Sequence, residues 1–147
     1  MIESRRLNDS NLLMKTNNIL NYSILFVSIY YILSFIIVAV LRMNYPFDLE
    51  WMEGTMLIHV IRLMHGLPIY PPPSIDFIPF IYTPGYFYLS SFAAQFFGAN
   101  YFSLRLVSFA AALIIIFFIF IIVRKETLSK ELGLISAGLF AACYEIS

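Results

Sequence analysis

Apolar residues form four long runs, at about residues 19–41, 77–97, 106–123 and 132–147. At 1.5 Å per residue, the first run as a helix reaches roughly 35 Å, and the hydrocarbon core of a bilayer is about 30 Å thick. The strands of a membrane barrel would alternate in polarity, and open sheet edges are not tolerated in hydrocarbon. The pattern therefore predicts an all-α, polytopic membrane protein.

Two of the runs are less regular than the others. The second contains Pro79, Pro84 and Gly85, so a re-entrant segment stays open beside a spanning helix, although we favour the spanning helix on length. The fourth stops at Ser147 after roughly 16 residues, too few to complete a crossing. We therefore expect residues 19–147 to be an incomplete transmembrane domain, either from a truncated gene product or fragment, or from a protein whose remainder a split partner supplies.

Composition supports the membrane class. Hydrophobic residues make up 61% of the chain and charged residues 12%, whereas soluble domains have about half and about a quarter. The zero net charge gives no indication of a nucleic-acid partner. The single cysteine, Cys143, excludes an internal disulfide and a cysteine-based metal cluster.

The charges between the runs predict the orientation. The tail, residues 1–18, has an excess of basic residues, which the positive-inside rule places in the cytoplasm. The loop at about residues 42–76 is then external, and we expect a multi-pass protein of the plasma (inner) membrane. If the second run spans, the basic stretch 124–131 is also external, which the rule disfavours.

The external loop contains a predicted amphipathic helix over Glu50–His65. Its apolar residues recur at helical spacing, and the opposite face carries polar ones (Met52, Met56, Val60 and Leu63 against Thr55, His59 and Arg62). Gly66 and the prolines at 71–73 are placed to end it. Such a helix is expected to lie along the membrane surface among the lipids.

Three acids at the start of this helix, Asp48, Glu50 and Glu53, are the candidates for chemistry. One of them could act as a general base, and two together could hold a divalent cation, so a cation cofactor stays open. The simpler interpretation is structural, and spacing alone favours it. In that interpretation Asp48 caps the helix, and the two glutamates complement the positive end of its dipole.

Other polar side chains have similarly plain interpretations. His59 and His65 are six residues apart, which does not suit metal binding on one helical face, so a solvated position is favoured. Arg62 and Arg105 could bind a phosphate bidentately, but arginines that snorkel at a membrane boundary are commoner. Tyr82 is most simply an interfacial aromatic residue.

The order of these features resembles the amino-terminal part of GT-C glycosyltransferases, and within them the bacterial family-39-type proteins related to protein mannosyltransferases and lipid A aminoarabinose transferases. The resemblance covers about residues 20–140 and is carried by five elements in sequence: Tyr45-Pro46-Phe47, Asp48-Leu49-Glu50 with Glu53-Gly54, His65 to Tyr70, Tyr82 to Leu89, and Phe96-Phe97-Gly98 with Leu104 to Ser108.

The resemblance implies a transferase that takes sugar from a polyprenyl-phosphate donor and passes it to a lipid, glycan or protein acceptor at the external face. It implies a catalytic acid, preferred in the order Asp48, Glu53, Glu50, because the family's adjacent acids are separated here. Arg62, His59 and Tyr82 would contact substrate, Arg105 would be structural, and no metal ligands are assigned. The chain alone is expected to be inactive.

Two other functions stay open. A non-catalytic membrane subunit would dock through the loop helix, and it would keep assembling when the acids are changed to amides. A transporter fragment ranks lowest, because transporters carry ionisable residues within their spans and the first three runs have none.

Overall fold

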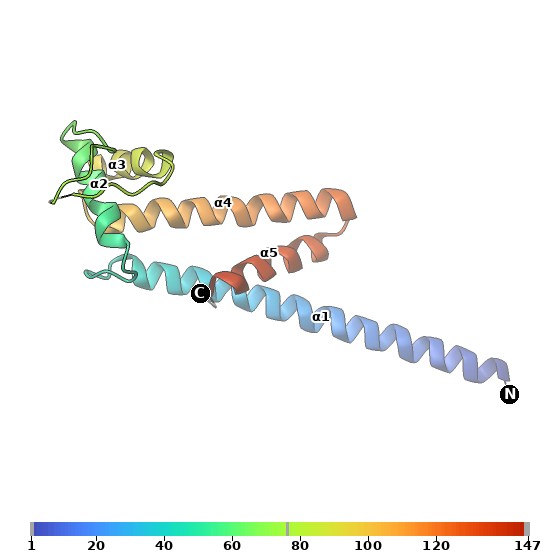
Figure 1. Cartoon of the computed structure of the whole chain (residues 1–147). Helices are drawn as coiled ribbons and strands as arrows, with labels where there is room; N and C mark the ends of the chain where they lie inside the picture. The colour runs from blue at the N-terminus through green and yellow to red at the C-terminus, as the bar shows by residue number, and fades with distance from the viewer. Residues whose placement is uncertain (1, 76, 146–147) are drawn as a thin grey trace. The chain divides into compact units, whose positions relative to one another are not determined.

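The computed structural model describes the backbone of residues 2–75 and 77–145 and the side chains of residues 19–75 and 77–143. These residues form an all-helical fold without strands (Figure 1). The helices are α1 (Ile2–Met43), α2 (Glu53–Met64), α3 (Gly85–Phe97), α4 (Tyr101–Thr127) and α5 (Lys130–Glu145). The all-α prediction is thus confirmed for the described residues, and α1 extends through most of the predicted tail.

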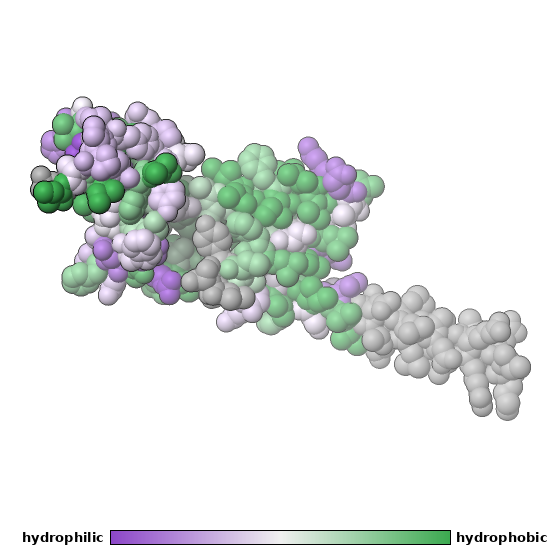
Figure 2. All heavy atoms as spheres, in the orientation of Figure 1, coloured by the Kyte–Doolittle hydropathy of each residue, from purple (hydrophilic) through white to green (hydrophobic). Residues whose placement is uncertain are grey.

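Two segments are long and apolar enough to cross a membrane. They are Ile19–Met43 within α1 and Tyr101–Thr127, the whole of α4. Only 11% and 6% of their most apolar windows are buried, although the core helix of a soluble protein would bury most of such a surface. Figure 2 shows the apolar side chains of α4 at the surface. The first and third predicted runs therefore lie within helices of membrane length.

The prediction of one helix over residues 77–97 is wrong. Residues 77–84 are not helical, and α3 begins only at Gly85, directly after Pro84 at its N-cap. Pro79 and Pro84 lack the N–H that a helix interior needs, and each disfavours the helical conformation of the residue before it. The 13 residues of α3 extend about 20 Å, less than the thickness of a hydrocarbon core.

Two compact units can be distinguished, residues 1–37 with 114–147, and residues 38–113. In the first unit, glycines let α5 approach its neighbours closely. A Cβ atom at Gly138 would lie 2.7 Å from the Ser28 carbonyl oxygen of α1, and one at Gly133 would lie 2.9 Å from the Phe120 carbonyl oxygen of α4. Small residues at such contacts are typical of helix packing in lipid. The fourth predicted run is helical to Glu145, and residues 146–147 lie outside the described part.

The second unit has its own small core. Val60 of α2, Ala94 of α3 and Leu104 of α4 are almost fully buried together, and Met56, Leu57 and Tyr86 pack around them. The Tyr86 hydroxyl donates to the Leu104 carbonyl at 3.3 Å. Burial raises the pKa of Tyr86 above its ordinary value, which keeps this hydroxyl protonated as a donor. The first turns of α4 are thereby fixed against α2 and α3.

The turn between α3 and α4 is set by two residues. Gly98 ends α3 with a positive φ of 83°, which glycine adopts without steric cost. Asn100 then caps α4, because its side-chain oxygen accepts the Ser103 N–H at 3.1 Å. The turn places Arg105 in the second turn of α4, close to the start of α2.

Candidate functional site

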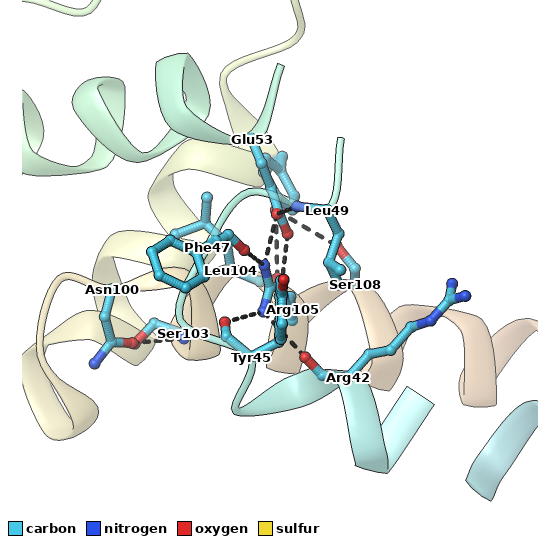
Figure 3. Close-up of polar contacts among 11 residues, drawn as sticks. Arg42, Tyr45, Phe47, Leu49, Glu53, Asn100, Ser103, Leu104, Arg105 and Ser108 are labelled. Atoms are coloured by element: carbon cyan, nitrogen blue, oxygen red, sulfur yellow. Dashed lines mark hydrogen bonds and ion pairs between the residues drawn. The ribbon is translucent and has the colours of Figure 1, made fainter. Parts of the chain in front are cut away.

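Arg105 holds together the chain segments around the acidic residues. Its guanidinium donates five hydrogen bonds, to the Arg42, Tyr45 and Phe47 carbonyls and to both oxygens of Glu53 (Figure 3). An arginine has five N–H donors in a rigid fork, so each of them is used here. We call Arg105, Glu53 and the three carbonyls the Arg105 cluster. Phosphate binding by Arg105, one of the options left open by the sequence, would require one of these bonds to break.

Glu53 is the acid that pairs with this arginine. Its oxygens accept from Arg105 Nε and Nη2, each at 2.7 Å, in a bidentate ion pair whose side chains are only 10% and 17% exposed. Oε2 also accepts the backbone N–H of Leu49 at 2.9 Å. Glu53 is in the first turn of α2, as predicted. Its carboxylate is therefore occupied in fixing the loop between α1 and α2 (residues 44–52).

Asp48 occupies a different position. A Cβ atom at Gly54 would lie 3.1 Å from Asp48 Oδ2. The Asp48 carboxylate therefore lies against the backbone of Gly54, at the start of α2, where a larger residue would crowd it. The Asp48 carboxylate raises the pKa of the neighbouring Tyr101 hydroxyl, and the Tyr101 ring centre lies 5.2 Å from the Arg105 guanidinium carbon. Asp48 is exposed, so it is the accessible acid next to the Arg105 cluster.

The predicted capping role of Asp48 is wrong. Helix α2 begins at Glu53 with Met52 as N-cap, and no side chain makes a capping hydrogen bond there. Glu50 lies before the helix and not in its first turn. Its backbone carbonyl accepts the Glu53 N–H at 3.0 Å. The helix therefore starts later than the sequence pattern predicts, and the Glu53 carboxylate accepts the Leu49 N–H just before it.

The solvated position predicted for His59 is also wrong. The side chain is completely buried, and its ring stacks on Phe87 of α3 with centroids 4.7 Å apart and planes at 9°. Nδ1 lies 2.7 Å from the Thr55 carbonyl, and Nε2 accepts the Phe80 N–H at 3.0 Å. The face of α2 that the sequence pattern marks as polar is therefore covered by α3 and by the loop before it. His65, in contrast, is exposed.

Arg62 and Tyr82 both fix the loop between α2 and α3 (residues 65–84). The Arg62 guanidinium donates to the Pro68 carbonyl at 3.3 and 3.2 Å and lies 4.3 Å above the centre of the Phe77 ring. The Tyr82 carbonyl accepts the Tyr70 hydroxyl, and the Tyr82 hydroxyl contacts Met52 Sδ at 3.6 Å. Of the three predicted substrate contacts, His59, Arg62 and Tyr82, the first is inaccessible and the other two are partly engaged.

Tyr101 is a site residue that the sequence interpretation missed. It lies within the predicted connection between the second and third runs and had no assigned role, although in a helix an aromatic hydroxyl four residues before Arg105 shares its face. In the described residues no group of three or more His, Cys, Asp or Glu side chains is placed to hold a metal ion. Neither a scan of protein-family models nor searches of curated proteins and solved structures finds a match to the chain.

Proposed function

We propose that this chain carries the acceptor-activating part of a multi-pass membrane glycosyltransferase, with Asp48 as the general base. The donor would be a polyprenyl-phosphate-linked sugar and the acceptor a hydroxyl or amine of a lipid, glycan or protein. The observation that carries the proposal is the division of roles among the acids. Glu53 is neutralised by Arg105, whereas Asp48 is held beside this pair with an exposed carboxylate.

A base of this kind needs a fixed position and an open lone pair. The Arg105 cluster fixes the carbonyls of residues 45 and 47, immediately before Asp48. Glu53 fixes the Leu49 amide immediately after it. The chain on both sides of Asp48 is therefore held by the same ion pair, and its carboxylate lies near the ends of both membrane-length segments.

The proposed reaction is a displacement at the anomeric carbon. Asp48 takes a proton from the hydroxyl or amine of the acceptor, while the acceptor oxygen or nitrogen forms a bond to this carbon. The bond from the carbon to the phosphate oxygen breaks, and polyprenyl phosphate leaves with the electron pair. Because the five N–H donors of Arg105 are used within the protein, the leaving phosphate would be bound by other groups.

The fold also suggests an orientation. The end of α1 and the start of α4 meet in the Arg105 cluster, so they would emerge on the same face of a membrane. If α3 does not cross, α4 returns the chain, and residues 124–131 reach the side of the amino-terminal tail. Both basic stretches are then cytoplasmic, which satisfies the positive-inside rule. The acids lie on the external side, where lipid-linked sugar donors would be met.

Because the chain alone is expected to be inactive, sugar transfer measured in native membranes, which would also hold the remainder of the transferase, tests the proposed base. Changing Asp48 to Asn keeps the shape of the side chain and removes its basicity, so transfer from a polyprenyl-phosphate hexose should fall by about 100-fold or more. Glu50→Gln is the matched control, because Glu50 is an exposed acid of the same loop. It should retain transfer within about twofold of wild type, since no step is assigned to its carboxylate.

The result that contradicts the proposal is full transfer by Asp48→Asn, or equal loss in both variants. A non-catalytic subunit gives the first of these results, because both variants then assemble normally and neither changes any transfer rate. Immunoprecipitation of the variants from the same membranes distinguishes loss of chemistry from loss of protein.

A further inference from the structure

His59 links three parts of the second unit through one buried ring. The ring lies between Phe87 of α3 and Phe80 of the α2–α3 loop, whose centroid is 5.7 Å away at 26°, and Phe77 approaches it at 5.0 Å. Both ring nitrogens lie within hydrogen-bonding distance of backbone groups, Thr55 O on α2 and Phe80 N in the loop. Both nitrogens of this buried ring therefore have polar partners, in a unit whose buried residues are mostly apolar.

These partners determine the protonation state of the ring. The Phe80 N–H can only donate, so Nε2 must be the unprotonated nitrogen that accepts it. Nδ1 then carries the hydrogen and donates to the Thr55 carbonyl at 2.7 Å. The second proton of an imidazolium would have to be placed on Nε2, directly facing the Phe80 N–H. The observed contact therefore exists only with a neutral His59.

The groups around the ring do not compensate a positive charge. On α2 the charged group next to these rings is Arg62, a cation over the Phe77 ring. In the loop the titratable neighbour is Tyr82, edge-on to Phe80, and on α3 it is Tyr86, edge-on to Phe87. Among the residues whose side chains are described, no carboxylate pairs with His59, and Asp76 lies outside that set. A second proton would thus be buried beside donors and another cation.

We propose that His59 is a proton-sensitive link that holds the α2–α3 loop on α2 and releases it when the imidazole is protonated. Loss of the Phe80 contact frees the segment that leads to Tyr82. The Tyr82 hydroxyl contacts Met52, the last residue of the loop between α1 and α2. The Arg62 contact to Pro68 lies nearer the other end of the loop and does not depend on the imidazole. Acidification would therefore loosen the part of the loop nearest the acids. This inference does not depend on the proposed transferase activity.

A spin label on the loop tests the link. Ile81 is fully exposed and follows Phe80, so Ile81→Cys in a Cys143→Ser background places the label at the released end. In nanodiscs, the mobile fraction of the spectrum should rise at least about threefold between about pH 8 and about pH 5. His59→Gln should remove this response, because a glutamine oxygen accepts the Phe80 N–H but does not titrate.

His65→Gln is the matched control, since the chain has two histidines and His65 is exposed, six residues further along the chain. It should keep the wild-type pH response. A label whose mobility does not change with pH in the wild type overturns the inference, and so does a response that survives His59→Gln or disappears in His65→Gln. If His59→Gln fails to fold, a pH response that His65→Gln retains is still assigned to His59, the one histidine left in that variant.

Discussion

Arg105 shows how one side chain organises a loop that has little secondary structure. Its fork pairs with Glu53 and its other N–H groups bind carbonyls that precede α2. Lysine cannot form the bidentate pair, and its ammonium cannot reach the same set of acceptors. We expect Arg105→Lys to lower the free energy of unfolding by about 2–4 kcal/mol, near the cost of breaking a buried ion pair. Reversible unfolding in detergent measures this change.

Arg42→Lys is the control for that measurement. Arg42 contributes its backbone carbonyl to the Arg105 cluster, and its own side chain is exposed. The substitution should therefore change the free energy of unfolding by less than about 0.5 kcal/mol. Equal stability of Arg105→Lys and Arg42→Lys would show that the cluster does not hold the loop.

The residue scale is also where the sequence interpretation was least successful. Spacing placed His59 on the polar face of α2 correctly, but it could not show that residues 77–87 cover that face. The acceptors of Arg105 lie 52–63 residues earlier in the chain, a separation that no periodicity reports. Asp48 looked like a cap because its residue type suits one. The positions of His59 and of the Arg105 acceptors were missed for one reason, because each depends on a tertiary contact.

Elements were predicted more successfully, because helices leave a local signal. The predicted Glu50–His65 helix differs from α2 by a few residues at its start and one at its end. Gly66 follows its end with a φ of 70°, and the Leu67 N–H binds the Arg62 carbonyl at 2.9 Å across the turn. The prediction of one helix over the second run was wrong because hydropathy identifies an apolar segment whether or not its prolines allow a helix.

The glycine after α2 provides a test at this scale. Gly66→Ala forces a Cβ into the left-handed region, so it should destabilise the unit by about 1–2 kcal/mol although nothing lies within 4 Å of that atom. Gly85→Ala is the matched variant, since its Cβ also meets open space and its φ is ordinary. It begins α3 and should be neutral or stabilising by up to about 1 kcal/mol. Thermal unfolding of both variants in detergent measures the two effects. Equal effects would contradict the prediction that the positive φ of Gly66 is what makes its substitution costly.

At the scale of the whole molecule, the proposed number of membrane crossings depends on whether α3 spans. The four-run pattern predicts that α3 crosses, which leaves the stretch 124–131, with its three basic and two acidic residues, outside. A 13-residue helix and a non-helical segment before it favour two crossings up to Thr127 instead. The same change removes the conflict with the positive-inside rule, so the length of one helix and the distribution of charge favour the same proposed topology.

Cysteine labelling separates the two topologies directly. In a Cys143→Ser background, Ile75→Cys and Lys125→Cys each place a thiol at an exposed position, one in the α2–α3 loop and one near the end of α4. A maleimide that cannot cross membranes should label Ile75→Cys in intact cells and Lys125→Cys only after permeabilisation. If α3 crosses, both positions lie outside and both react in intact cells. Labelling of Lys125→Cys alone would place the acids in the cytoplasm, away from an external sugar donor, and would remove the basis for assigning Asp48 as the base.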